Sequence, residues 1–206
     1  MQTIIAVMHD GIDEAQIRRA GDILKEGGLV AFPTETVYGL GGNALNAQAS
    51  AKIYAAKGRP SDNPLIVHIA DWEAIDKIAS EIPPEAKKLA DAFWPGPLTM
   101  ILKKSDAVPM ATTGGLETVA IRMPSNEVAR ALIRAGGGYV AAPSANTSGR
   151  PSPTCAAHVV QDLSGKIDMI IDGGNANIGL ESTIVDLTEG KPTILRPGYI
   201  NQEMLE

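Results

Sequence analysis

Two cations follow a helix-forming stretch of the chain and enter a loop bounded by prolines. Lys57 and Arg59 lie two residues apart, and residues 60–64 read Pro-Ser-Asp-Asn-Pro. One interpretation is that the cations stabilise the negative end of the preceding helix, an effect of about 0.3–1 kcal/mol. The other is that they bind an anion, because a phosphate chain requires positive charge at close range. The sequence leaves both interpretations open.

A second polar segment follows a run of small residues. Residues 141–152 read Ala-Ala-Pro-Ser-Ala-Asn-Thr-Ser-Gly-Arg-Pro-Ser. Small residues permit close approach of another backbone, and the hydroxyls, the amide and the cation suit an anion or a nucleotide. Ser and Asn are also frequent in turns that bind nothing, so a simple turn is the alternative.

Three further polar residues interrupt apolar runs. Arg122 and Arg196 each end an apolar run, and His68 lies inside residues 65–69. A partly buried guanidinium needs an anion nearby, either a substrate or one of the 24 Asp and Glu side chains. A lone histidine in an apolar strand is more often a core residue than a ligand.

Several well-known catalytic motifs are missing from the chain. It has no Gly-x-x-x-x-Gly-Lys-Ser/Thr loop, no His-x-x-x-His or Cys-x-x-Cys pair and no Gly-x-Ser-x-Gly elbow. The residues that remain are Lys, Arg, Ser, Asn and Thr, without an obvious nucleophile. This set favours chemistry done by positioning and charge stabilisation on an anionic substrate, as in phosphoryl or nucleotidyl transfer.

The composition limits the class of protein. The 206 residues are 44% apolar and 20% charged, which predicts a folded globular chain, and one Cys excludes a disulfide framework. The apolar runs are far shorter than the roughly 18 residues that span a bilayer. Because the N-terminus lacks the features of a signal peptide, we expect a cytoplasmic protein with no membrane partner. A net charge of −6 disfavours a broad nucleic-acid surface.

Helical and strand patterns alternate along the chain. We expect helices around 17–24 and at 47–56, 71–80, 84–93, 126–135 (capped by Ser125) and 154–163, and strands at 29–32, 65–69, 98–103, 118–122, 139–142, 168–171, 183–187 and 193–195, with a loop over 33–43. Some consecutive strands have no helix between them. The pattern therefore predicts one α/β domain with a mixed, partly antiparallel sheet rather than a doubly wound one.

Eight segments together resemble the YrdC/Sua5 family. They are FPTETVYGL (32–40), KGRP (57–60), NPLIVH (63–68), WPGPLT (94–99), VAIRMP (119–124), APSAN (142–146), ESTIVD (181–186) and LRPG (195–198). The resemblance covers about residues 12–200, in order. It implies one YrdC-like domain over residues 1–206, in which a twisted mixed sheet with flanking helices surrounds a concave cavity.

The resemblance also implies an activity. Family members are nucleotidyltransferases that make L-threonylcarbamoyladenylate and pyrophosphate from L-threonine, bicarbonate and ATP. Their product serves the downstream machinery that forms N6-threonylcarbamoyladenosine at position 37 of tRNA. Mg²⁺ is expected to accompany ATP, held mainly by phosphate oxygens and water rather than by protein ligands.

Site residues follow from the family motifs. The Lys-x-Arg and Ser-x-Asn signature, implied to be catalytic and ATP-binding, falls on Lys57, Arg59, Ser144 and Asn146. Further ATP-binding positions fall on Asn63, Thr118, Ser152 and Arg196. Positions that hold threonine in the family fall on Thr36, His68, Arg122, Ala142 and Ser182, and Arg122 suits the threonine carboxylate.

The resemblance departs from the long family members after residue 198. Those members continue through a linker into a second domain, whereas only residues 199–206 remain here, so we expect the short form. The main alternative function is a double-stranded RNA or tRNA-binding module without catalysis. It would gather Lys57, Arg59, Lys103, Lys104, Arg122, Arg150 and Arg196 into one basic surface.

Hydrogenase-maturation proteins contain a related domain, but this chain lacks their acylphosphatase and zinc segments.

Overall fold

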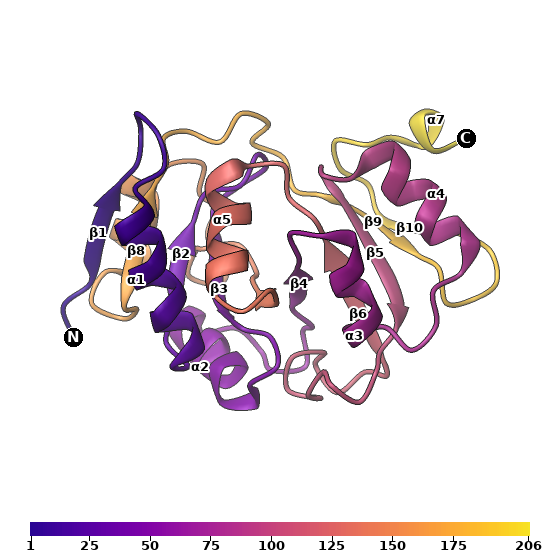
Figure 1. Ribbon diagram of the computed structural model, residues 1–206, viewed down its shortest axis with the longest axis horizontal. Helices are drawn as coiled ribbons and strands as arrows, with labels where there is room; N and C mark the ends of the chain where they lie inside the picture. The colour runs from indigo at the N-terminus through magenta and orange to yellow at the C-terminus, as the bar shows by residue number, and fades with distance from the viewer.

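One mixed sheet of ten strands organises the chain. The computed structural model describes residues 1–206, and Figure 1 shows the N-terminus at the β1 end of the molecule and the C-terminus at the other. The strands are β1 (Ile4–Val7), β2 (Val30–Phe32), β3 (Gly39–Asn43), β4 (Ile66–His68), β5 (Leu98–Lys103), β6 (Thr118–Arg122), β7 (Val140–Ala141), β8 (Met169–Asp172), β9 (Thr183–Asp186) and β10 (Thr193–Arg196). Their order in the sheet is β1-β8-β2-β3-β7-β4-β6-β5-β9-β10. Parallel and antiparallel pairs both occur, for example β4 with β6 and β5 with β6, so the prediction of a mixed sheet is confirmed.

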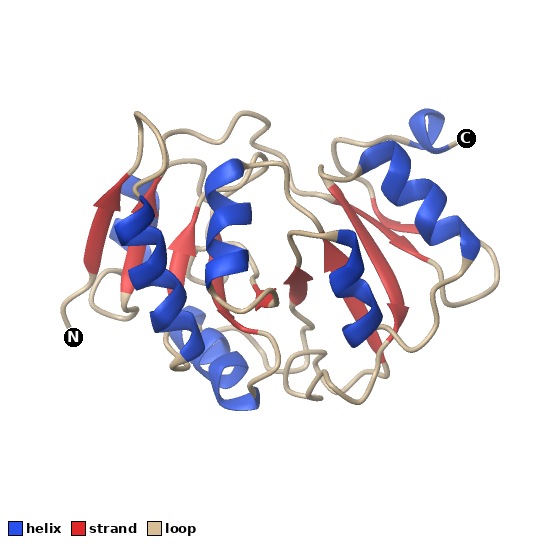
Figure 2. Cartoon of the chain, in the orientation of Figure 1, coloured by secondary structure: helices blue, strands red, loops and turns tan.

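The expected helices are present, except that the segment 71–80 differs in form and the short helix at the C-terminus was not expected (Figure 2). They are α1 (Glu14–Lys25), α2 (Ala47–Lys57), α3 (Ile75–Ile78), α4 (Pro84–Phe93), α5 (Glu127–Ala135), α6 (Ala156–Leu163) and α7 (Gln202–Leu205), with a 3-10 turn η1 (Trp72–Ala74). The helix expected over 71–80 is therefore a short 3-10 turn followed by a single turn of α-helix. None of these helices combines the length and the apolar character that crossing a bilayer requires.

The cap of α5 differs from the prediction by one residue. Asn126, not Ser125, is the N-cap: its side chain accepts a hydrogen bond from the backbone N–H of Ala129 at 3.0 Å. The backbone N–H of Ser125 instead donates to Glu35 at 3.0 Å. The backbone N–H groups before α5 are thus satisfied by a carboxylate far away in the sequence, while the Asn126 side chain supplies the cap.

The expectation of a loop over 33–43 is wrong for its second half, because residues 39–43 form β3. The glycines that indicate a turn here serve close packing instead. A Cβ on Gly41 would lie 2.9 Å from both the Phe32 ring and a Val140 methyl group. Strand β1 was not anticipated either. It is an edge strand whose four residues are all apolar, although Ile5 and Val7 are exposed, so the sequence shows no alternation of polar and apolar residues there.

The side chains of the sheet alternate between two hydrophobic clusters. Val30 and Phe32 lie in a cluster with α1 and α5, whereas Ala31 lies in a cluster with α2 and α6. Figure 1 shows α1 and α5 next to each other at one end of the sheet, and α3 and α4 at the other end. The apolar residues Leu98 and Met100 of β5 belong to the cluster that also contains residues of α3 and α4. Period-two alternation in the strands thus determines which side chains the helices cover.

The opposite face of β4, β5 and β6 carries polar residues. His68 of β4 is paired in register with Arg122 of β6, and Arg122 is paired with Thr99 of β5. Cross-strand partners lie on the same face of a sheet. The mixed topology therefore brings three strands together with their polar side chains on one face, where the candidate site lies.

A prediction concerns the contact between α1 and α5. A Cβ on Gly21 of α1 would lie 2.5 Å from the backbone oxygen of Ala135 at the end of α5. Helix propensity alone would make Gly21→Ala stabilising by about 1 kcal/mol. We expect instead a loss of about 1–3 kcal/mol, because the backbone of α5 must move. Urea denaturation measures this, with the exposed Arg19→Ala on the same helix as the control; an unchanged or raised stability would mean that the two helices separate at no cost.

Candidate functional site

A cavity of about 210 Å³ opens over the polar face of β4 and β6. It includes nine of the thirteen residues that the family motifs indicated, namely Thr36, Arg59, Asn63, His68, Arg122, Ala142, Ser144, Ser182 and Arg196. These residues come from segments far apart in the sequence, and the fold brings them together. The volume is below the roughly 300–1,000 Å³ of sites for drug-sized ligands, so a nucleotide bound here must extend beyond the cavity.

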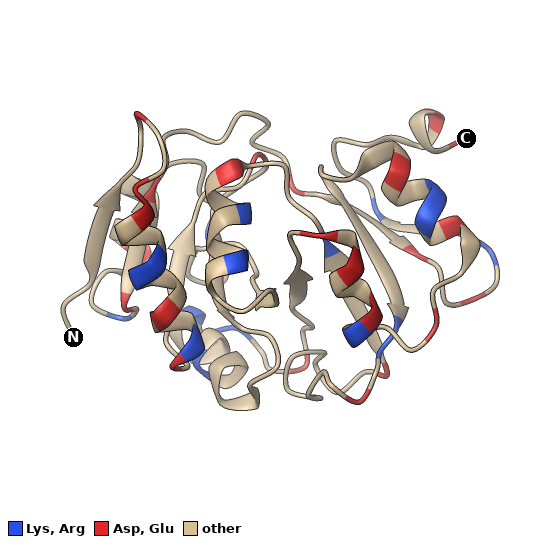
Figure 3. Cartoon of the chain, viewed as in Figure 1, with Lys and Arg blue, Asp and Glu red and all other residues tan.

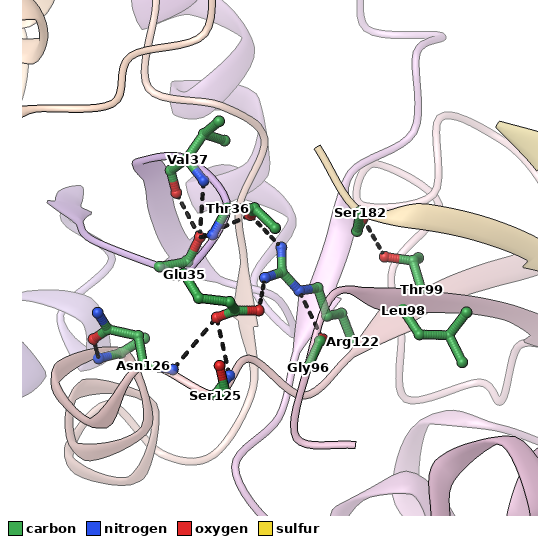
Figure 4. A network of polar contacts seen from close by, with 12 residues as sticks. Glu35, Thr36, Val37, Gly96, Leu98, Thr99, Arg122, Ser125, Asn126 and Ser182 are labelled. Atoms are coloured by element: carbon green, nitrogen blue, oxygen red, sulfur yellow. Dashed lines mark hydrogen bonds and ion pairs between the residues drawn. The ribbon is translucent and has the colours of Figure 1, made fainter. Parts of the chain in front are cut away.

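The lining residue Arg122 belongs to a buried ion pair (Figure 4). Arg122 is 4% exposed, and its Nη2 is paired with a carboxylate oxygen of Glu35, which is 8% exposed. The guanidinium also donates from Nη1 to the Thr36 hydroxyl at 2.9 Å and from Nε to the Gly96 carbonyl at 3.3 Å. One N–H on each terminal nitrogen therefore has no partner in the protein. Two N–H groups of this kind are what a carboxylate needs for a two-pronged contact.

The hydroxyls beside Arg122 have a fixed direction of hydrogen bonding. Thr34 lies 2.5 Å from the Val37 carbonyl, which can only accept, so the single hydroxyl proton of Thr34 goes there. The hydroxyl of Thr36, 2.9 Å from that of Thr34, must then donate to it while accepting from Arg122. Thr36 can consequently only accept a hydrogen bond from a ligand.

His68 is a second acceptor in the same cavity. Its Nδ1 lies 3.1 Å from the Ile66 carbonyl oxygen and so carries a proton. Burial, with a smaller contribution from the nearby charge of Arg122, lowers the pKa of His68 to about 3, so the ring is neutral near pH 7. Its Nε2 therefore carries no proton and can accept a hydrogen bond from a hydroxyl or an amine. The resemblance places His68 among the threonine contacts, and His68 lines the cavity.

Arg196 and Glu181 also line the cavity. Arg196 donates from Nε and Nη2 to the Ser182 carbonyl, at 3.1 and 2.9 Å, and its Nη1 is 2.8 Å from a Glu181 carboxylate oxygen. The hydroxyl of Ser182 is 2.8 Å from that of Thr99. Both members of the Arg196–Glu181 pair are more than one third exposed, so a bound anion can compete with Glu181 for Arg196.

Arg59 also lines the cavity, and its side chain hydrogen-bonds to the loop that follows it. It donates to the carbonyls of Asn63 at 3.3 Å and Pro64 at 3.1 Å. Partial burial lowers the pKa of Arg59, but a guanidinium remains charged at any working pH. With Arg196, it provides two cations on the same cavity, which suits a ligand with several negative charges.

The position of Lys57 differs from the expectation that it contacts phosphates. Its side chain is 1% exposed, and its ammonium group donates to the carbonyls of Ser144 and Asn146, the latter at 2.6 Å. Burial, with a smaller contribution from Arg59, lowers the pKa of Lys57 to about 8. Lys57 does not line the cavity. It ties the end of α2 to the loop that carries Ser144.

Three other predicted residues also lie outside the cavity lining. The Asn146 amide is buried and donates to the carbonyls of Thr147 and Arg150, both at 2.9 Å. Ser152 donates to Glu181 at 2.9 Å and so acts on a lining residue. Thr118 lies further along β6, paired with Lys103. Contact of these residues with a nucleotide stays a prediction.

Two acidic residues of the cavity region were missed. Glu35 and Glu181 were not selected from the sequence, because a carboxylate next to hydroxyls indicates an ordinary turn. The available signal was the two arginines, each of which required an anion. Glu35 supplies it for Arg122, and Glu181 supplies it for Arg196.

The seven cations of the RNA-binding alternative do not form one basic surface. Lys57 and Arg122 are buried, and Arg150 is paired with Asp162 at 2.7 Å. Figure 3 shows Lys and Arg interspersed with Asp and Glu along α1 and α4. Nothing in this distribution favours nucleic-acid binding without catalysis.

Comparisons with known proteins agree with the fold and with the resemblance. The profile of the Sua5/YciO/YrdC family, described as telomere recombination, matches residues 22–198. The chain is 57% identical over 204 residues to threonylcarbamoyl-AMP synthase of Pyrococcus abyssi and 55% identical over 195 residues to the Bacillus subtilis protein of that name. It covers 60% and 56% of these relatives, which correspond to 99% and 94% of the chain.

A solved structure has the same fold. The crystal structure of P. abyssi Sua5 complexed with L-threonine superimposes with a TM-score of 0.96 at 57% identity, over 98% of this chain and 59% of that one. The expected mixed α/β architecture is thereby confirmed. Since the chain spans little more than half the length of these relatives, the short form stays a prediction.

We predict that His68 makes stability depend on pH. The folded pKa of about 3 is below the ordinary value of 6.5, so the unfolded chain binds more protons between these values. The contribution of neutral His68 to the free energy of unfolding is then fully present above pH 6.5. It falls on acidification by up to about 1.4 kcal/mol per pH unit. Denaturation midpoints from pH 7.5 to 5 should show this slope, which His68→Gln should reduce and the exposed His158→Gln should not. An equal slope in all three proteins would show that His68 is not held neutral.

We also predict a difference between the two cations of the Lys-x-Arg signature. Lys57→Ala leaves two buried carbonyls unpaired and should cost about 2–4 kcal/mol. Arg59→Ala removes a partly exposed side chain and should cost less than about 1 kcal/mol. The denaturation midpoints of the two variants measure the difference. Equal stabilities would mean that the Lys57 bonds contribute no more to folding than the partly exposed Arg59 side chain does.

Proposed function

This chain belongs to the Sua5/YciO/YrdC family, and from that premise we propose that it makes threonylcarbamoyl-AMP and pyrophosphate from L-threonine, bicarbonate and ATP. The observation that carries the proposal is that one cavity is lined by the buried Arg122 guanidinium, which keeps two N–H groups unpartnered, and by the two further cations Arg59 and Arg196. The name shared by the curated relatives supports the same reaction.

The polarity of the cavity suits L-threonine. The two free N–H groups of Arg122 would bind its carboxylate. Thr36 and His68 can only accept hydrogen bonds, which matches the amine and hydroxyl donors of the amino acid. Ala142 offers a small apolar contact for the methyl group. The complex of P. abyssi Sua5 with L-threonine supports this assignment.

The reaction requires two bond-forming steps. The threonine amine attacks carbon dioxide, or bicarbonate with loss of water, and a carbamate forms. A carbamate oxygen then attacks the α-phosphorus of ATP, and pyrophosphate leaves, so the enzyme would be a nucleotidyltransferase. Arg59 and Arg196 would stabilise the charge on the phosphates, and Lys57 would hold the Ser144 loop in place. Mg²⁺ would enter with ATP, held by phosphate oxygens and water.

The wider role also belongs to the proposal. The product would pass to the machinery that transfers the threonylcarbamoyl group to adenosine 37 of tRNA, in the cytoplasm. Direct RNA binding by this chain is not needed for that role, because the product is a small molecule.

The test is release of pyrophosphate from Mg·ATP. It should require both threonine and bicarbonate. Serine should be a poor but detectable substrate, since one missing methyl group costs only about 1–3 kcal/mol. Valine should be worse by roughly 10⁴-fold, because the acceptors that read the hydroxyl stay unpaired.

Arg59→Ala should lower kcat/KM for ATP by roughly 10- to 100-fold, the equivalent of one charged hydrogen bond. Arg19→Ala, an exposed arginine on α1, is the matched control and should leave turnover unchanged. Pyrophosphate release that does not depend on threonine, or equal turnover of valine, would refute the proposal.

A further inference from the structure

We propose that Glu35 is a positioning residue for amino-acid recognition, acting through Arg122 to leave only two N–H groups available to a substrate carboxylate. The inference rests on the proposed function only for the identity of the amino acid. No motif assignment placed Glu35 in the site, and it would not contact the substrate itself.

Both oxygens of the Glu35 carboxylate are fixed. One is paired with Nη2 of Arg122. The other accepts from the backbone N–H groups of Ser125 at 3.0 Å and Asn126 at 3.3 Å, at the start of α5 (Figure 4). Burial alone would raise the pKa of Glu35, but the charge of Arg122 and the backbone donors outweigh it, and the pKa lies below its ordinary value. The carboxylate is therefore ionised and cannot move to follow the guanidinium.

Arg122 is consequently held from three directions. Glu35 holds Nη2, the Thr36 hydroxyl holds Nη1 and the Gly96 carbonyl holds Nε. A guanidinium has five N–H groups, so one remains on each terminal nitrogen. The side chain is thus oriented before any ligand binds, and an incoming carboxylate need not order it.

A purely structural ion pair is the alternative. It would hold β6 against the 33–38 loop without influencing any ligand. The two interpretations differ in one measurable quantity, which is the preference of the protein for a ligand with a carboxylate over the same ligand without one. A structural role changes the affinity for both ligands alike, whereas a positioning role changes only the affinity for the carboxylate.

The experiment measures binding of L-threonine and L-threoninamide by calorimetry. Wild-type protein should prefer threonine. In Glu35→Gln the amide oxygen can accept from only one of the two sets of donors, Arg122 or the backbone N–H groups before α5. The amide N–H group then faces the other set, donor against donor, so Arg122 loses its fixed orientation. We expect threonine affinity to fall roughly 10- to 100-fold, the equivalent of one charged hydrogen bond, with threoninamide affinity nearly unchanged. KM for ATP should change less than about 3-fold, because Glu35 makes no hydrogen bond to Arg59 or Arg196, the two cations proposed to bind the phosphates.

Leu132→Ala is the matched control for stability. Leu132 is fully buried in α5 and makes no hydrogen bond to Arg122, so its variant should lose stability and keep the threonine preference. Glu35→Asp is a second variant, which keeps the charge but is one methylene too short to reach both sets of partners. Its preference for threonine over threoninamide should fall, as in Glu35→Gln.

Each outcome decides the inference. An unchanged preference in either Glu35 variant, or an equal loss for both ligands, overturns it. Failure of both variants to fold assigns Glu35 to fold stability and also overturns it. Wild-type protein that binds threonine but releases no pyrophosphate refutes the proposed function and leaves this comparison valid. Wild-type protein without a preference for threonine refutes the role of Arg122, and with it that of Glu35, even if pyrophosphate is released.

Discussion

A buried guanidinium at the end of β6 is the constraint around which the site is arranged. A charge taken out of water must be paired and hydrogen-bonded, or the fold loses several kcal/mol, typically about 3–5 when one partner of such a pair is removed. Arg122 draws its partners from the 33–38 loop, from the segment before β5 and, through Glu35, from the start of α5. The hydrogen bonds and the ion pair of Arg122 and Glu35 therefore connect three segments that are not joined to one another by strand pairing. The cavity is the space that these segments leave beside the sheet.

Sequence patterns predicted the strands and helices well wherever the period of the apolar residues was clear. β5, β6 and α4 occupy the ranges expected for them. The failures have physical causes. Three of the five residues of β3 are glycines that leave room for neighbouring side chains such as that of Val140, which is remote in sequence, so no local pattern indicates this strand. The edge strand β1 pairs only with β8, which is more than 160 residues away in sequence, so its own segment does not decide it.

The candidate site shows the same division between local and distant information. Residue types in the sequence indicated which side chains carry charge, and nine of the thirteen residues indicated by the family motifs line one cavity. What could not be predicted is which cations face solvent. Lys57 and Arg59 are two residues apart, yet one is sealed against the Ser144 and Asn146 carbonyls and the other lines the cavity. The left-handed Gly58 between them, with a φ of 67°, ends α2 and turns the chain, so that the two side chains diverge.

The position of β1 and β8 in the sheet has a consequence for how the molecule is made. β8 lies between β1 and β2, and it pairs Met169 with both Ile4 and Val30. A chain that emerges from the ribosome N-terminus first must therefore hold two apolar strands without their shared neighbour until residues 169–172 have been synthesised. Strand pairings so distant in sequence form slowly and leave edges open to other chains in the meantime. The step at which β8 inserts between them is where we place the greatest exposure to misassembly during biosynthesis.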